Sequence, residues 1–160
     1  MIEFFFSLGF LKKLPRTGWL RRNINFTYDT VASHSFRVAI IAYFLAKEEG
    51  VDPERAALGG LVHDIHEYLI GDLDPTMKKY LSIDEEAIAE TLPLEGVLKE
   101  IWLDIFKKRD MSLYHVVKDA DILEAIIEGV EQNVDPEFLD NLQKRLYYST
   151  SKKWAKEVRS

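Results

Sequence analysis

The chain of 160 residues contains no cysteine, which excludes a disulfide framework, cysteine-rich zinc sites and thiol nucleophiles. It also lacks an uninterrupted apolar run of about 18 residues, so we expect no membrane span. Basic residues are not in excess, because 21 Lys+Arg oppose 27 Asp+Glu and the net charge is −6. An acidic balance argues against binding to polymeric nucleic acid, which requires Lys and Arg to replace the counterions of the phosphates.

The apolar run at residues 2–11 does not have the pattern of a secretory signal. No basic residue precedes it, Glu3 stands where positive charge is expected, and no small-residue cleavage site follows. We therefore expect a cytoplasmic protein with no membrane partner, and the absence of cysteine is compatible with a reducing compartment.

What is present is typical of a folded globular protein, with 47% hydrophobic and 30% charged residues. A chain of this length favours one domain over residues 1–160. The hydrophobic periodicity is helical nearly throughout and predicts an all-α fold of about six to seven helices. The expected helices cover residues 2–14, 30–50, 52–69, 82–93, 94–108, 112–134 and 136–156, with a loop at 15–29.

Ionisable residues stand on the apolar faces of three of these helices. They are His34, the adjacent pair His63 and Asp64, and Asp121. A carboxylate that is buried without partners costs several kcal/mol, so these groups need hydrogen bonds, ion pairs or a metal. Each one alone is typical of a satisfied core residue. Together they form a mixed nitrogen and oxygen ligand set, although spacing alone does not establish that they converge.

The order His34, His63-Asp64, Asp121 resembles that of the HD-domain metal-dependent phosphohydrolases, which are named for the adjacent His-Asp pair. Further segments resemble the 5'-deoxynucleotidase branch of that family, and together the similarity covers roughly residues 1–130. These segments are residues 11–19, Arg22-Asn23, and residues 31–35, 62–67, 71–73 and 118–121. The resemblance implies a helical bundle of the HD type. Its metal-site helices would lie within residues 30–130, with a C-terminal helix at 136–156 for packing or oligomer contact.

By this resemblance, four residues would ligate one divalent metal ion, with Mn, Co or Mg favoured and Zn, Ni or Fe as alternatives. The four are His34, His63, Asp64 and Asp121. Glu67 would orient or deprotonate the attacking water, and Asp72 would assist at the leaving 5'-oxygen. Arg16 would hold the phosphate, because a guanidinium fork suits phosphate oxygens. Trp19 would pack against the deoxyribose, with plain core packing as the alternative.

The function implied is hydrolysis of deoxyribonucleoside 5'-monophosphates to deoxynucleoside and phosphate, by a protein that forms a homodimer as family members commonly do. Two alternatives are a related phosphodiesterase or broader nucleotidase and a non-catalytic metal- and nucleotide-binding module. A third is a helical domain whose buried His and Asp side chains merely pair.

Some residues are left without an assigned role. Residues 4–28 carry five basic side chains and no acidic one, which indicates either a solvated edge or a local anion site. His66 is not expected to be a metal ligand, and His115 is expected at a surface or interface. The apolar cluster at residues 4–6 and the helix face with Phe138 and Leu142 are core or dimer interface.

Overall fold

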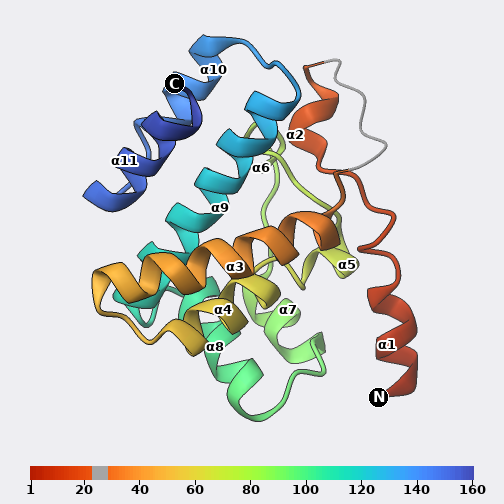
Figure 1. Ribbon diagram of the computed structural model, residues 1–160. Helices are drawn as coiled ribbons and strands as arrows, with labels where there is room; N and C mark the ends of the chain where they lie inside the picture. The colour runs from red at the N-terminus through yellow and green to blue at the C-terminus, as the bar shows by residue number, and fades with distance from the viewer. Residues whose placement is uncertain (23–28) are drawn as a thin grey trace.

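The computed structural model describes residues 1–22 and 29–160 (Figure 1). Within these ranges every regular element is helical, which confirms the all-α prediction, and one isolated β-bridge joins Pro15 to Thr30. None of the described helices combines the length and the apolar character that a membrane crossing needs. In chain order the helices are α1 (Ile2–Leu8), α2 (Thr17–Leu20), α3 (Val31–Glu49), α4 (Pro53–Val62), α5 (Glu67–Ile70), α6 (Pro75–Lys78), α7 (Glu85–Thr91), α8 (Gly96–Phe106), α9 (Met111–Glu131), α10 (Pro136–Gln143) and α11 (Ser149–Val158).

The described residues thus form eleven helices rather than six or seven, partly because the N-terminal region is more broken than its periodicity predicts. α1 ends at Leu8 instead of continuing to residue 14. Gly9 has a low helix propensity, and both Gly9 and Leu11 donate to carbonyl oxygens three residues back, which marks turns. These turns bury Leu11, and the short helix α2 then lies inside the predicted loop at 15–29.

The predicted helix at 52–69 is wrong in its second half, where turns at residues 63–66 separate α4 from α5. His63 is the physical reason, because its Nδ1 lies 2.7 Å from the carbonyl oxygen of Gly60. In a continuous helix that oxygen would accept from the backbone N–H of Asp64. The His-Asp pair therefore lies on a turn between two helices.

Other helix starts differ from the prediction by a few residues. The helix predicted from residue 82 begins at Glu85, because the side chain of Asp84 accepts from the backbone N–H of Ala87. Asp110 caps α9 in the same way. Asp74 followed by Pro75 starts α6, which the periodicity does not predict because the helix has only 4 residues.

Two long helices, α3 and α9, cross at the centre of the molecule; α4 packs against both, and α8 packs against α4 and α9 (Figure 1). The bounds of α3 confirm the prediction of 30–50: Thr30 accepts from Ser33 N, and Gly50 ends the helix at φ 68°. α3 and α4 approach closely, since a Cβ added at Gly60 would lie 2.7 Å from Ala39 Cα. This contact brings His34 on α3 close to the turn that follows α4. The largest fully buried apolar side chains are Trp102, Leu45, Ile101, Leu113, Leu123, Ile126, Val31, Val38, Val116 and Val117.

The C-terminal segment is fastened to α9 by the buried carboxylate of Asp119. Its oxygens accept from the backbone N–H groups of Tyr147 and Tyr148 and from Ser151 Oγ. The chain turns around this carboxylate, so the predicted helix at 136–156 is replaced by α10 and α11. Both helices lie along α9.

Replacing Asp119 by alanine is expected to lower the free energy of unfolding by about 3 kcal/mol. The change leaves buried donors without an acceptor, and hydrogen bonds to a charged group are each worth more than neutral ones. Urea denaturation followed by circular dichroism measures the effect. Asp140→Ala is the matched control, because Asp140 is exposed and pairs with Arg159 at the surface. Equal stability of the two variants would contradict the anchoring role of Asp119.

Candidate functional site

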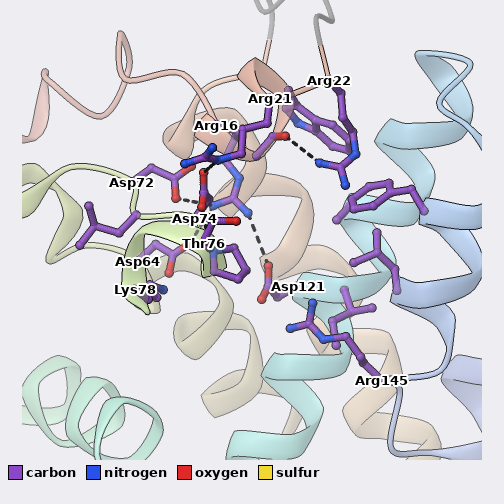
Figure 2. A pocket seen from close by; sticks show the side chains of 18 of the residues that line it. Arg16, Arg21, Arg22, Asp64, Asp72, Asp74, Thr76, Lys78, Asp121 and Arg145 are labelled. Atoms are coloured by element: carbon purple, nitrogen blue, oxygen red, sulfur yellow. Dashed lines mark hydrogen bonds and ion pairs between the residues drawn. The ribbon is translucent and has the colours of Figure 1, made fainter. Parts of the chain in front are cut away.

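A cavity of about 340 Å³ opens between α2, the segment at residues 64–78, α9 and α10 (Figure 2). Such a volume suits a small-molecule ligand. The acidic side chains that line it are Asp64, Glu67, Asp72, Asp74 and Asp121. The basic ones are Arg16, Arg21, Arg22, Lys78, Lys118 and Arg145. Trp19, Leu73, Ile122, Ala125, Phe138 and Leu142 add an apolar wall. A ligand with an anionic end and an apolar end therefore matches this lining.

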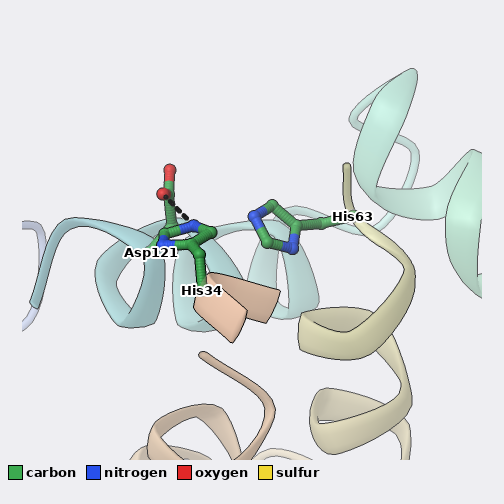
Figure 3. A group of neighbouring side chains, drawn as sticks. All are labelled: His34, His63 and Asp121. Atoms are coloured by element: carbon green, nitrogen blue, oxygen red, sulfur yellow. Dashed lines mark ion pairs between the residues drawn. The ribbon is translucent and has the colours of Figure 1, made fainter. Parts of the chain in front are cut away.

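His34, His63 and Asp121 come together beside this cavity from α3, the turn after α4, and α9 (Figure 3). One ligand atom from each lies within 4.8 Å of the others. His34 Nε2 is 3.2 Å from Asp121 Oδ1, and the two imidazole ring centroids are 5.5 Å apart. Three of the four predicted metal ligands thus lie close enough together for one ion to contact all of them.

The hydrogen bonding of the two imidazoles fits a metal ion better than simple pairing. On each ring Nδ1 is engaged by the protein, with Glu124 Oε2 for His34 and the Gly60 carbonyl for His63. Both Nε2 atoms are buried, and neither makes a hydrogen bond of good geometry within the described residues. Two imidazole nitrogens fixed through their other nitrogen, with a carboxylate oxygen beside them, are a donor set that divalent transition metals accept.

Asp64, the fourth predicted ligand, lies at the edge of this group. Its Oδ2 is 3.1 Å from His63 Nε2 and 3.2 Å from Arg16 Nη1. Burial opposes its ionisation, but His63 and Arg16 hold the pKa of Asp64 well below its usual range. Asp64 therefore stays ionised beside the histidine pair.

Arg16 places its guanidinium among three carboxylates (Figure 2). Besides Asp64, it lies 3.9 Å from Asp72 Oδ1 and 3.8 Å from Asp121 Oδ1. Burial alone would lower the pKa of Arg16, but these carboxylates raise it above its ordinary value. Arg16 is thus a fixed cation at the wall of the cavity, next to the predicted ligands.

Glu67 is the buried carboxyl group of the site, with 4% of its surface exposed. Burial and the neighbouring carboxylates of Asp64 and Asp72 raise the pKa of Glu67 to about 10. Its Oε2 has no hydrogen-bond partner within the described part of the chain. A cation nearby favours the ionised form of such a group, so Glu67 is placed to accept and release a proton.

Asp72 connects the cavity to the segment that carries Arg16. Its Oδ2 accepts from Thr17 N at 2.7 Å, and its carbonyl oxygen accepts from Thr17 Oγ1 at 2.8 Å. These two bonds hold the residue next to Arg16, so Asp72 positions the arginine in addition to lining the cavity.

Trp19 packs as a core residue and also borders the cavity. Its indole is buried, donates from Nε1 to Asp29 and packs edge-on against Phe138 at 6.0 Å, as a core residue does. Trp19 nevertheless lines the cavity, so the same ring can contact a ligand. Asn23, part of the resembling segment, lies outside the described residues.

The remaining two histidines lie outside the ligand group. His66 packs its ring against Trp102 and Phe106, and burial lowers the pKa of His66 to about 4, which keeps the ring neutral. His115 stacks on Tyr147 with ring centroids 3.8 Å apart. Neither belongs to the three-residue group around His34.

The apolar residues that the sequence left as core or dimer interface lie partly in the core and partly at the surface. Leu142 is buried and Phe138 lines the cavity. In the N-terminal cluster, Phe4 packs against Tyr68, whereas Phe6 is 81% exposed.

Glu124 is the site residue that the sequence did not reveal. It is fully buried on α9, contacts His34 Nδ1 and accepts from Arg37 Nε at 3.0 Å. Burial and the Arg16 cation lower the pKa of His34, but the neighbouring carboxylates of Asp121 and Glu124 raise it to about 9. The available signal was the three-residue spacing from Asp121, which places both carboxylates on one face of a helix.

Replacing Glu124 by glutamine is expected to weaken divalent-metal binding about 10- to 100-fold, the usual cost of losing a partner that orients a ligand. Titration of the purified protein with Mn²⁺ in a calorimeter measures the affinity. Glu131→Gln serves as control, since Glu131 contacts Arg37 at the surface and not His34. Unchanged affinity in the Glu124 variant would show that this carboxylate does not orient His34.

Comparison with known proteins gives consistent matches. A family model described as HD domain matches residues 8–160. A protein of Bos taurus named 5'-deoxynucleotidase HDDC2 is 30% identical, over 97% of this chain and 78% of its own length. A protein of the same name from Dictyostelium discoideum is also 30% identical, over 88% of this chain and 81% of its own. The solved structure of a conserved hypothetical protein from Pyrococcus furiosus has a TM-score of 0.77 and 32% identity, with 99% of both chains covered.

Proposed function

The chain belongs to the HD domain family, and from this premise we propose that it is a metal-dependent 5'-deoxynucleotidase. It hydrolyses deoxyribonucleoside 5'-monophosphates to deoxynucleoside and inorganic phosphate. The names of its relatives support the activity, and one observation of the structure carries it. Two buried imidazole nitrogens and the carboxylate of Asp121 meet beside a cavity whose wall presents the cation of Arg16.

We assign the divalent ion, of which Mn, Co and Mg are the best candidates, to the four predicted ligands. They are His34, His63, Asp64 and Asp121. An ion bound there would polarise the phosphate ester and lower the pKa of water at the site. The two histidines, each fixed through its Nδ1, supply neutral ligands, and the two carboxylates supply the negative charge.

We assign a separate role in the hydrolysis to each of four residues around the ligands. Arg16 binds the phosphate oxygens through its guanidinium fork. Glu67, which a cation bound beside it would hold in the ionised form, takes the proton of the water whose oxygen attacks phosphorus. As the bond from phosphorus to the 5'-oxygen breaks, Asp72 assists protonation of that oxygen. Trp19 packs against the deoxyribose at the apolar wall of the cavity.

Incubation of the metal-loaded protein with each deoxyribonucleoside 5'-monophosphate, followed by assay of free phosphate, tests this function. We expect release that depends on added metal and exceeds that from AMP. No release with Mn²⁺, Co²⁺ or Mg²⁺ would overturn the enzymatic proposal, and nucleotide binding without release would indicate a non-catalytic module. Equal release from AMP, or cleavage of a cyclic dinucleotide, would indicate a broader nucleotidase or a phosphodiesterase.

Replacing Arg16 by lysine is expected to raise KM for the deoxynucleotide about 10- to 100-fold with a smaller change in kcat. The lysine keeps the charge but loses the two-pronged contact, and a hydrogen bond to a charged group contributes about 1.5–3 kcal/mol. Steady-state phosphate release measures both constants. Arg109→Lys, which alters a surface ion pair with Asp104, is the control. An unchanged KM would remove Arg16 from the substrate site.

A further inference from the structure

The indole of Trp19 lines the cavity from a helix that is too short to orient it. α2 has only 4 residues, Thr17–Leu20, and a helix of one turn has little stability of its own. The torsion that rotates an aromatic ring about its Cβ–Cγ bond has broad, roughly two-fold preferences. Contacts from elsewhere in the chain must therefore select the orientation of this ring.

The carboxylate of Asp29 supplies the first of these contacts. Its Oδ2 accepts from Trp19 Nε1, and both residues are 6% exposed. Ser33 Oγ donates to the other oxygen, Asp29 Oδ1, at 3.4 Å. Ser33 lies in the first turn of α3, the helix that also carries His34. The nitrogen edge of the indole is thus fastened to a helix of the predicted metal site.

The opposite edge of the indole is held by α9 and α10. A Cβ added at Gly129 of α9 would lie 3.7 Å from Trp19 Cη2, so the ring approaches the backbone of that helix closely. Phe138 of α10 packs edge-on against the ring, with centroids 6.0 Å apart. Asp29 is therefore the polar contact of a ring whose remaining contacts are apolar and do not depend on the direction of its N–H.

The backbone of Asp29 makes a separate contact with the other substrate residue of this loop. Its carbonyl oxygen accepts from Arg16 N at 3.2 Å. This bond does not involve the side chain, so it is available to any residue at position 29. A substitution of Asp29 consequently alters the support of Trp19 and leaves the backbone support of Arg16 in place.

We propose that Asp29 is a positioning residue that sets the preference for deoxyribose over ribose by holding the indole of Trp19 in one orientation. This inference rests on the proposed function, in which Trp19 packs against the deoxyribose. A ribonucleotide differs by one hydroxyl group, so a wall excludes it only when the wall is held to within about 0.5 Å. Asp29 is not among the residues that line the cavity, and it acts on the substrate through Trp19.

Replacing Asp29 by leucine tests the role, because leucine is similar in shape but offers no acceptor to the indole N–H. We expect the ratio of kcat/KM for dAMP to kcat/KM for AMP to fall about 10-fold, the usual worth of one hydrogen bond. Asp29→Asn keeps an acceptor oxygen and should restore most of the ratio. Thr30→Ala is the matched control, since it removes the neighbouring cap of α3 and leaves the Asp29 side chain in place. It should change both nucleotides alike.

Two further measurements establish the route through Trp19. In a Trp19→Phe background, which lacks Nε1, Asp29→Leu should cause no further change in the ratio. Heteronuclear NMR of the full chain with Mg²⁺ observes the indole N–H directly and needs no turnover. The signal of Trp19, identified by its absence in Trp19→Phe, should move in Asp29→Leu and stay in Thr30→Ala.

The outcomes separate this inference from the function on which it rests. No phosphate release from dAMP or AMP by the natural chain would overturn the proposed function and the inference together. Equal release from both by the natural chain, or an active Asp29→Leu variant with the natural ratio, would overturn the inference alone. A fall in the ratio that is equally large in the Trp19→Phe background would also overturn it. Should Asp29→Leu not fold, Asp29→Ala carries the same test, because it too lacks an acceptor.

Discussion

Replacing Asp121 by alanine is expected to abolish stoichiometric divalent-metal binding and, with it, metal-dependent phosphate release. Asp121 supplies the carboxylate of the three-residue group, so its loss leaves only the two imidazoles and the more peripheral Asp64 to hold a dication. Loss of a partner that only orients a ligand costs about 10- to 100-fold in metal affinity, and loss of a ligand itself should cost at least as much. Elemental analysis of the protein after gel filtration, together with Mn²⁺ titration, measures the change.

A second effect of this substitution must be separated from the loss of metal. Lys118 Nζ lies 2.6 Å from Asp121 Oδ2, so the alanine also leaves a lysine without its partner. The double variant Asp121→Ala, Lys118→Met removes that unpaired charge and should still lack metal. Asp104→Ala, which breaks only a peripheral pair with Arg55 and Arg109, should retain it. Metal at the natural stoichiometry in folded Asp121→Ala protein would show that Asp121 is not a ligand.

Replacing Glu67 by glutamine is expected to lower kcat about 10²- to 10⁴-fold, the range that general acid–base catalysis contributes, while metal content stays unchanged. Glutamine has nearly the same shape but cannot accept a proton at its amide oxygen near neutral pH. Burial and two neighbouring carboxylates raise the pKa of Glu67, so a neutral amide is not expected to destabilise the fold. Phosphate release at saturating substrate measures kcat, and elemental analysis measures the metal.

The two measurements on the Glu67 variant distinguish its possible roles. Loss of turnover with full metal content agrees with a residue that handles the proton of water. Loss of both would make Glu67 a metal ligand, whereas natural kcat would remove it from catalysis. Glu157→Gln, at an exposed position on α11, should change neither quantity.

The extent to which the sequence predicts the structure differs between local and distant contacts. The start of α4 was readable because Asp52 and Pro53 act on backbone groups within one turn. The end of α3 was readable because Gly50 adopts the left-handed conformation that glycine tolerates. The interruption at residues 63–66 was not readable, since one side chain, that of His63, competes for a helical carbonyl.

The site shows the same division. The sequence provided the residue types and order of the predicted ligands and of Arg16, and through them the resemblance to HD-domain phosphohydrolases. It did not reveal Glu124, whose importance comes from contact with His34, 90 positions earlier in the chain. Nor did it show that Asp72 holds Thr17, the residue beside Arg16.

By itself, then, the sequence determined the helical class, the ends of the central helix α3 and the absence of any thiol chemistry. Helix caps act on backbone groups within one turn, and the lack of cysteine is a property of composition that no fold can change. Only the tertiary structure decided which polar atoms meet, which stay unpaired and which apolar side chains remain outside. The physical reason is that burial belongs to packed helices and not to single ones. On α3 the inward Val38 and the outward Ile40 are equally apolar as residues, and only the packing of α4 and α9 against one face distinguishes them.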